Sequence, residues 1–167
     1  MNALADEIRA QLEGARNLYN RLILVVGPAG SGKTAALRAL CDGDGLPCVN
    51  LNLVLSQRLL EHASKARPLR LRGALDEVLA KAEGDVVVLD NIEILFDPGL
   101  KQDPLRLLQL ASRNRTVVAS WNGDATARTL SYAAAGHPEH RRYTDVDTII
   151  VRAGRKSDAR AGEGDAR

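Results

Sequence analysis

Residues 27–34 combine amino acids that together can bind a phosphate group. The segment reads Gly-Pro-Ala-Gly-Ser-Gly-Lys-Thr, the Walker A pattern G-x-x-x-x-G-K-[ST]. Its glycines let the backbone turn tightly, so that backbone N–H groups reach phosphate oxygens. Lys33 supplies a positive charge for the β- and γ-phosphates, and the Thr34 hydroxyl is a ligand for Mg²⁺. The pattern predicts nucleotide contacts from Gly27, Pro28, Ala29, Gly30, Ser31, Gly32, Lys33, Thr34 and Ala35.

A second motif follows the Walker B pattern, in which an apolar strand ends on a carboxylate. Residues 86–89 are Val-Val-Val-Leu, and Asp90 comes directly after them. A buried strand fixes such a carboxylate, which can then hold Mg²⁺ through the water shell of the ion. The sequence therefore predicts a metal site made by Thr34 and Asp90. The alternative is an ordinary aspartate that caps the next segment.

Two further polar residues are candidates for activating a water molecule. Asn91 follows Asp90 and cannot accept a proton, but Glu93 can reach the site if the chain curls after the strand. Asn122 follows the apolar stretch 116–121 and could reach the γ-phosphate or the attacking water. The alternatives are a surface carboxylate for Glu93 and an Asn-Gly turn at Asn122. If no base is present, hydrolysis is slow or needs a residue from a partner.

These residues need a scaffold that brings the ends of separate strands together. Apolar periodicity and turn residues predict helices at 3–19, 33–41, 54–62, 73–83 and 104–112, and strands at 22–26, 48–52, 85–90, 116–121 and 148–151. Strands that alternate with helices predict an α/β fold with a parallel sheet between two helical layers. Residues 122–147 are expected to be polar and irregular. A basic stretch at 65–72 separates the predicted helices at 54–62 and 73–83.

The length of 167 residues indicates one folded domain. We expect an N-terminal amphipathic helix within 1–20, a P-loop NTPase domain at 21–153 and a disordered tail at 154–167. A net charge of +2 does not favour a general polyelectrolyte role for the protein. The aromatic content of 3% does not favour a nucleic-acid-binding module that stacks bases on aromatic rings. No apolar run is long enough for a bilayer, and Asp6 and Glu7 precede any apolar stretch, so we expect no membrane contact and a cytoplasmic location.

Other residues that could form sites have simpler interpretations. Cys41 and Cys48 are expected to be small apolar fillers rather than a disulfide or metal pair. His137 and His140 have no second pair of ligands and are expected to be loop histidines. The cations at 65–72 suit an ordinary protein surface better than a DNA contact, although a direct contact with DNA stays open.

The order of motifs and elements resembles the AAA+ core. More narrowly, residues 15–152 resemble the BrxF family, small P-loop proteins of type 3 BREX phage-defence systems. The matching segments include Leu-Asp-Asn-Ile-Glu at 89–93 and Asn-Arg-Thr at 114–116, with further segments at 18–22, 49–53, 101–105, 121–123 and 136–138. The resemblance implies an ATP-binding component of a multi-protein system that modifies host DNA and blocks phage replication. About fifteen residues follow the last predicted strand, too few for the C-terminal helical lid of a full AAA+ module.

The resemblance also implies roles for specific residues. Asn122 would correspond to sensor 1, and Arg141 or Arg142 would reach the γ-phosphate of a neighbouring subunit in an oligomer. Arg113 and Arg115 compete for that role, and solvated surface positions are the simple alternative for all four arginines. The predicted catalytic residues are Lys33, Asp90, Glu93, Asn122, Arg141 and Arg142.

The predicted function is a Mg²⁺-dependent ATPase that forms homo-oligomers and acts with other BREX proteins. Two alternatives remain open at this point. One is a nucleotide-gated adaptor with negligible hydrolysis, which Asn91 favours. The other is a small nucleotide kinase, which would need an acceptor pocket and a lid.

Overall fold

The computed structural model describes residues 2–133 and 136–154. The strands are β1 (Leu22–Gly27), β2 (Cys48–Asn50), β3 (Val86–Asp90), β4 (Thr116–Ala125), β5 (Thr129–Tyr132), β6 (Arg141–Thr144) and β7 (Ile149–Arg152). The helices are α1 (Ala3–Ala15), α2 (Lys33–Asp44), α3 (Leu51–Leu59), α4 (Arg67–Lys81) and α5 (Pro104–Ala111), with 3₁₀ turns at Glu93–Phe96 and Pro98–Leu100. Among the described residues, no helix combines the length and the apolar character needed to cross a bilayer.

The sheet has the strand order β2-β3-β4-β1-β7, and all of these strands run parallel. β1 lies between β4 and β7, and all six of its residues are buried. Parallel strands need covered faces, which explains the continuous apolar character of β1 and β3. The predicted α/β fold with a parallel sheet is confirmed.

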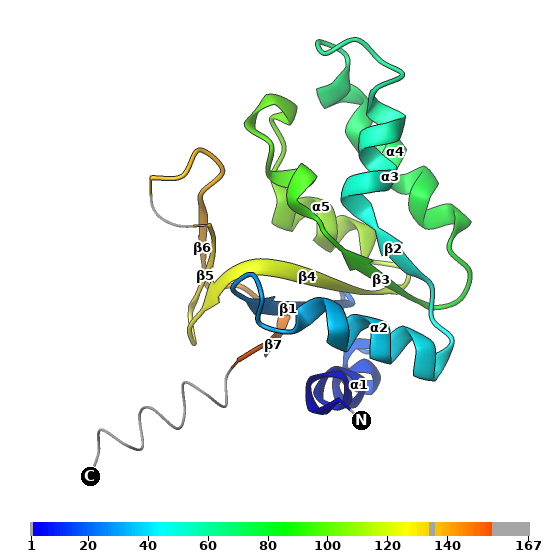
Figure 1. The fold of residues 1–167 in the computed structure, drawn as a ribbon, viewed down its shortest axis with the longest axis vertical. Coiled ribbons are helices and arrows are strands. Elements are labelled where there is room, and N and C mark those ends of the chain that lie inside the picture. Colours follow the sequence, from blue (N-terminus) through cyan, green and yellow to red (C-terminus); the bar gives the residue numbers. More distant parts are fainter. Residues whose placement is uncertain (1, 134–135, 155–167) are drawn as a thin grey trace.

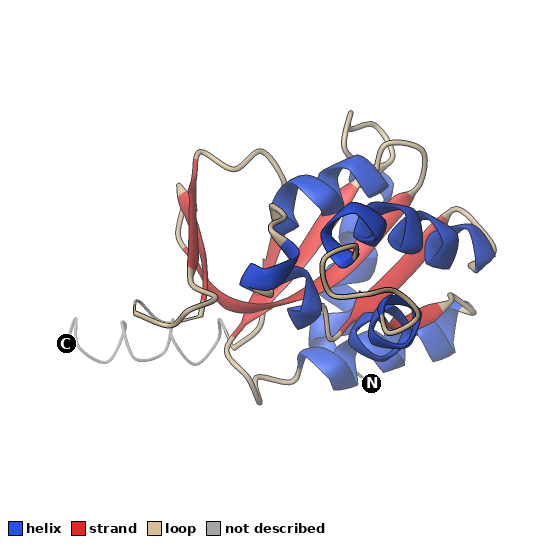
Figure 2. Cartoon of the chain, turned by 90° about the horizontal axis from the view of Figure 1, so that it is seen from above, coloured by secondary structure: helices blue, strands red, loops and turns tan. Residues whose placement is uncertain are grey.

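Alternate residues of β1 contribute to two separate apolar cores. Leu22, Leu24 and Val26 pack in the core that α3, α4 and α5 cover, while Ile23 and Val25 pack in the core under α1 and α2. This is the two-residue period of a strand that is buried on both faces. Figures 1 and 2 show the resulting three layers, with the sheet between the two groups of helices.

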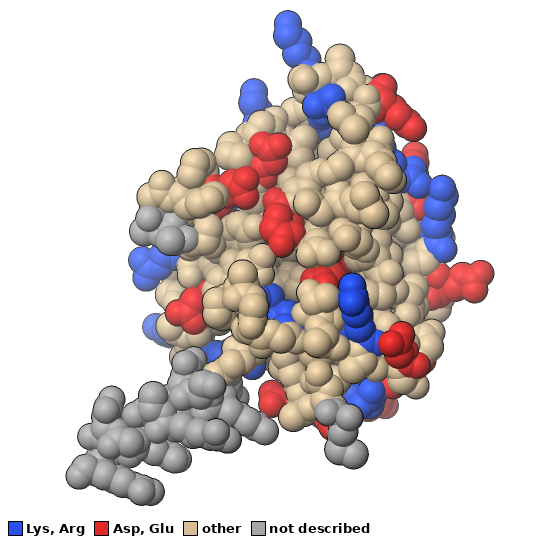
Figure 3. Space-filling view, in the orientation of Figure 1, with Lys and Arg blue, Asp and Glu red and all other residues tan. Residues whose placement is uncertain are grey.

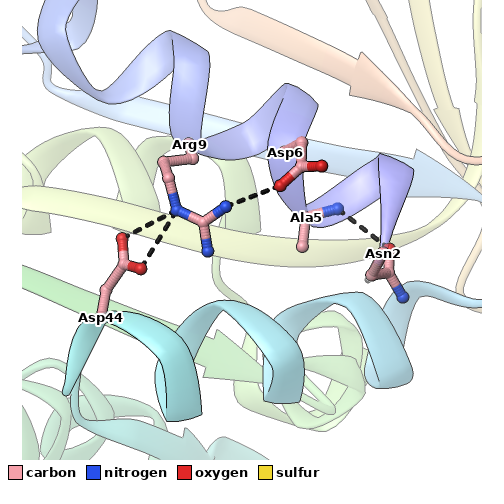
Figure 4. Close-up of polar contacts among 5 residues, drawn as sticks. All are labelled: Asn2, Ala5, Asp6, Arg9 and Asp44. Carbon is pink, nitrogen blue, oxygen red and sulfur yellow. Dashed lines mark hydrogen bonds and ion pairs between the residues drawn. The ribbon is translucent and has the colours of Figure 1, made fainter.

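Helix α1 is fixed to α2, the helix that follows the phosphate loop. Asn2 Oδ1 accepts a hydrogen bond from the Ala5 amide and begins α1. Arg9 donates to both Asp44, 3.1 Å away at the end of α2, and Asp6, 2.7 Å away (Figure 4). The helix ends at Ala15 rather than at the predicted residue 19, since the next backbone bonds are short i→i−3 turns, such as that from the Leu18 amide to the Ala15 carbonyl.

Two predicted boundaries between elements are wrong, one because a side chain caps α3 and one because α4 starts earlier than predicted. The predicted strand at 48–52 ends at Asn50, whose side chain accepts a hydrogen bond from the Leu53 amide and begins α3. Part of the basic stretch is helical, because α4 starts at Arg67 and carries Pro68 in its first turn. The Arg67 guanidinium donates to the carbonyls of Leu59 and His62, which fixes the connection between α3 and α4.

The prediction of an irregular segment at 122–147 is also wrong. β4 continues to Ala125 and pairs antiparallel with β5, which in turn pairs with β6 (Figures 1 and 2). The Tyr132 ring stacks on Phe96, from the 3₁₀ turn after β3, and meets Trp121 of β4 edge-on, so three aromatic residues from three elements anchor this extension. A contact of this kind leaves no local periodicity in the sequence.

Gly123 gives a testable requirement for this extension. A Cβ atom at Gly123 would overlap the Ser131 carbonyl oxygen of the paired strand and lie 3.1 Å from Trp121 Nε1. Gly123→Ala is therefore expected to lower the free energy of unfolding by about 3 kcal/mol, the upper part of the range for overpacking. Urea denaturation measures this change.

The matched control is Gly73→Ala in α4, where an added Cβ meets no atom within 4 Å. This control should raise stability by up to about 1 kcal/mol, because alanine is the better helix former. If Gly123→Ala is as stable as the wild type, the β4–β5 pairing described above is wrong.

Candidate functional site

The phosphate-loop pattern lies between a strand and a helix, as its chemistry requires. β1 ends at Gly27 and α2 begins at Lys33. Gly30 and Gly32 have φ angles of +79° and +92°, in the left-handed region that other residues rarely adopt. At Gly27, a Cβ atom would lie 2.6 Å from Ser31 Oγ and 2.9 Å from Ala153 Cβ. The glycines are therefore needed both for the turn and for the packing of the loop.

Lys33 lies across the concave side of this loop. Its Nζ atom donates to the carbonyl oxygens of Gly27 and Pro28, each at 2.7 Å, and to Ser31 Oγ at 3.3 Å. Only 6% of the residue is exposed. Burial lowers the pKa of the Lys33 ammonium, and the negative charges of Asp90 and Glu93 oppose this effect. An entering phosphate group would add negative charge beside Lys33 and favour its charged form.

Asp90 connects the phosphate loop with the end of β3. Its Oδ2 atom accepts a hydrogen bond from Thr34 Oγ1 at 2.8 Å. Its Oδ1 atom accepts two hydrogen bonds, from Ser120 Oγ at 2.6 Å and from the Asn91 amide at 2.9 Å. Only 8% of the Asp90 residue is exposed. The two residues predicted to hold a metal ion thus lie in direct contact.

Ser120 is a site residue that sequence reasoning missed. It lies in β4, where it interrupts an apolar run, and it precedes Asn122 by two positions. Residues two apart in a strand project from the same face of the sheet, so a hydroxyl at this spacing was a usable signal. Both side chains line the same cavity beside the phosphate loop.

Glu93 and Asn122 also meet at this cavity. Asn122 Nδ2 donates to Glu93 Oε1 at 2.9 Å, and Asn122 is in register with Gly27 of β1. Glu93 begins the 3₁₀ turn after β3. The chain therefore curls after the strand, which is the condition under which Glu93 can reach the site. Its Oε2 atom is buried and has no hydrogen-bond partner among the residues that the structure describes. The alternative of an Asn-Gly turn at Asn122 is wrong, because β4 continues through this position.

One cavity of about 470 Å³ joins these groups. It is lined by Ala29, Gly30, Gly32, Lys33, Thr34, Ala35, Asp90, Asn91, Glu93, Ser120 and Asn122. A hydroxyl and a carboxylate are hard oxygen ligands, which suit Mg²⁺. In the described part of the chain, no three His, Cys, Asp or Glu side chains form a closed metal cage. Mg²⁺ fits such an open oxygen site, because it keeps water molecules and takes further oxygens from phosphates.

The candidate arginines lie elsewhere. Arg141 and Arg142 are on β6, and the cavity is lined by neither. Arg141 Nη2 donates to the Gln102 carbonyl at 2.8 Å, whereas Arg142 is exposed. Arg115 donates to the carbonyls of Leu79, Ala82 and Gly84 and so satisfies the end of α4, which is a structural role. Arg113 lies over the Tyr19 ring, 5.3 Å from its centroid.

The remaining sequence candidates have local contacts. Cys41 and Cys48 are free thiols. The pKa of Cys41 is raised to about 12, mainly by burial and to a smaller extent by the neighbouring Cys48. His137 Nδ1 accepts a hydrogen bond from the Glu139 amide at 3.0 Å, and His140 Nδ1 lies 3.2 Å from the Ala133 carbonyl oxygen. On the face shown in Figure 3, basic and acidic side chains are interspersed.

Comparison with known proteins gives one family. The family described as "ATPase family associated with various cellular activities (AAA)" matches residues 23–109, which is more than half of the chain. No curated protein sequence is a significant match.

Several solved structures are similar at low identity. A DNA replication initiation factor is 16% identical with a TM-score of 0.48, over 96% of this chain and 48% of that one. DnaA from Aquifex aeolicus bound to AMPPCP is 22% identical with a TM-score of 0.42, over 71% and 38%. PCH-2 from C. elegans is 20% identical with a TM-score of 0.39, over 90% and 40%. The chain thus spans less than half of the length of each of these structures.

Proposed function

Because the chain belongs to the AAA family of ATPases, we propose that the cavity beside the phosphate loop binds ATP with Mg²⁺ and that the protein hydrolyses it. One observation carries this proposal. Thr34 Oγ1 and Asp90 Oδ2 lie 2.8 Å apart at the cavity that Lys33 also lines. Lys33 and Thr34 come from the start of α2, directly after the loop, whereas Asp90 comes from the end of β3, and a purely structural aspartate would not require this convergence.

The residues of the chain have distinct roles in this proposal. The loop amides and the N-terminus of α2 bind the phosphates, and Lys33 exchanges its contacts with loop carbonyls for contacts with phosphate oxygens. Thr34 and Asp90 hold Mg²⁺, which neutralises charge on the phosphates when it is bound. Glu93 accepts a proton from the attacking water, and Asn122 orients Glu93 through their hydrogen bond.

Glu93→Gln tests the proposed general base. The glutamine keeps the size of the side chain and can still accept from Asn122, but it cannot take a proton. We expect the rate of phosphate release to fall about 100-fold or more, with nucleotide affinity within about twofold of wild type. Glu83→Gln, an exposed change after α4, is the matched control and should leave the rate unchanged. An unchanged rate in Glu93→Gln removes Glu93 from this role.

A nucleotide-gated adaptor with negligible turnover is the second candidate. Two observations favour it: Asn91 stands directly after Asp90, and Glu93 Oε1 is already engaged by Asn122. An adaptor would bind MgATP and release no phosphate in the presence of its partners. Phosphate release above background by the wild type, and its loss in Glu93→Gln, would decide for the ATPase.

We further propose that the protein assembles with copies of itself and with other proteins of a BREX phage-defence system. The resemblance of the motifs at 89–93 and 114–116 to the BrxF family supports the second part. Arg142 on β6 is exposed and does not line the cavity of its own chain. It is therefore the candidate to reach the same cavity in a neighbouring copy of the protein. Lys65, just before α4, and Arg70 and Arg72, within α4, are exposed and are candidates for a direct contact with DNA.

Light scattering with and without a non-hydrolysable ATP analogue tests binding and assembly together. We expect the molar mass to rise when the analogue and Mg²⁺ are added. A constant molar mass at a saturating concentration of the analogue would contradict nucleotide-dependent self-assembly. It would not contradict nucleotide binding, which titrations measure separately.

A further inference from the structure

The two oxygens of the Asp90 carboxylate have different surroundings. Oδ1 accepts from both Ser120 Oγ and the Asn91 amide, at 2.6 and 2.9 Å. Oδ2 accepts from Thr34 Oγ1, at 2.8 Å. Thr34 is itself the other oxygen ligand of the proposed metal site. Oδ2 is therefore the oxygen that remains for the metal ion or for a water molecule bound to it.

Ser120 is well placed to maintain this difference. It lies in β4, which pairs in parallel with β3 up to Leu89 and Ala119, so Ser120 stands beside Asp90 at the end of the pairing. The residue is 5% exposed, and little water can compete for its hydroxyl. A hydrogen bond from a buried hydroxyl to a carboxylate is stronger than one between neutral groups.

The Asn91 amide alone would not fix the carboxylate. The torsion angle of an aspartate carboxylate has a broad energy minimum, so one donor leaves it free to rotate. The bond from Ser120 adds a second fixed donor on the same oxygen, from a different strand. Together the two donors keep Oδ2 directed toward Thr34.

We propose that Ser120 is a positioning residue that turns the Asp90 carboxylate so that Oδ2 faces Thr34 and the bound metal ion. This inference rests on the proposed function, because it assigns a residue to the metal site of the same cavity. Ser120 touches neither the nucleotide phosphates nor the metal ion in this account. It acts through Asp90, and its loss should weaken metal binding without weakening the phosphate contacts of the loop.

The test separates metal binding from nucleotide binding. Affinity for an ATP analogue is measured in EDTA and in Mg²⁺, and metal occupancy is measured directly by electron paramagnetic resonance with Mn²⁺. For Ser120→Ala we expect the affinity in EDTA to be unchanged and the Mn²⁺ affinity to fall about tenfold, as is typical when a partner of a metal ligand is removed. Ser120→Thr keeps the hydroxyl and should restore most of the affinity for the ion.

A matched control corrects for the loss of any buried serine. Ser112 is fully buried, and its hydroxyl donates to the Gln109 carbonyl at 2.9 Å, away from the cavity. Ser112→Ala should leave Mn²⁺ affinity unchanged, and thermal unfolding of all variants shows that each is folded.

The inference is overturned if Ser120→Ala binds Mn²⁺ as tightly as the wild type, or if its affinities in EDTA and in Mg²⁺ fall equally. A wild-type protein that takes up neither nucleotide nor metal would refute the proposed function as well. The two failures are thus distinguishable from the behaviour of the wild type.

Discussion

Lys33→Ala is expected to lower the affinity for MgATP about 100-fold. The Lys33 ammonium has 2.7 Å contacts with two loop carbonyls, and in the nucleotide complex it would bond to phosphate oxygens instead. A hydrogen bond to a charged group contributes about 1.5–3 kcal/mol, which corresponds to roughly 10- to 150-fold in affinity. We place the effect toward the upper end, since the residue is buried and water cannot replace it well.

Titration with a fluorescent ATP analogue measures this change. Lys81→Ala is the matched control, because Lys81 is exposed in the last turn of α4 and lies away from the cavity. The control should bind as the wild type does. If Lys33→Ala binds the analogue as tightly as Lys81→Ala, the phosphates do not occupy this loop.

Asp90→Asn is expected to reduce Mg²⁺-dependent phosphate release by at least about 100-fold. The substitution keeps the size of the side chain but removes the negative charge that would hold the ion with Thr34. Loss of several kcal/mol of charge stabilisation by the metal accounts for an effect of this size. Affinity for the nucleotide in EDTA should change little, since the loop and Lys33 are untouched.

The two parts of this prediction are measured separately, by phosphate release in Mg²⁺ and by analogue binding in EDTA. Asp76→Asn is the control, as Asp76 is exposed on α4. Full turnover in Asp90→Asn would contradict the assignment of the metal site. Loss of binding in EDTA would show that Asp90 instead supports the loop structure.

The parts of the fold that depend on local pattern could be predicted from the sequence. The apolar strand before Gly27 and the apolar strand before Asp90 are continuous runs, and the parallel topology then brings the loop and the carboxylate to the same edge of the sheet. The convergence of Lys33, Asp90, Glu93 and Asn122 on one cavity agrees with these predictions. Their catalytic and binding roles remain proposals for the experiments above.

The parts that depend on distant contacts could not be predicted. The β5–β6 extension is anchored by contacts of Trp121 and Tyr132 with Phe96, which lies 25 or more positions earlier in the sequence. The contact between Ser120 and Asp90 spans 30 residues. The start of α4 at Arg67 has no side-chain cap, and the Arg67 guanidinium bonds back to the Leu59 carbonyl at the end of α3, a contact that apolar periodicity does not reveal. The predicted disordered tail at 154–167 lies outside the described residues, except for Gly154.

The proposal that this cavity holds a metal-bound triphosphate is tested most directly by isothermal titration calorimetry. ATP is titrated into the pure, folded wild-type protein, once with Mg²⁺ and once with EDTA. We predict saturable binding of about one ATP per chain that is tighter with Mg²⁺ than without it. Absence of heat and of binding in both titrations, for ATP and for GTP, would contradict the account.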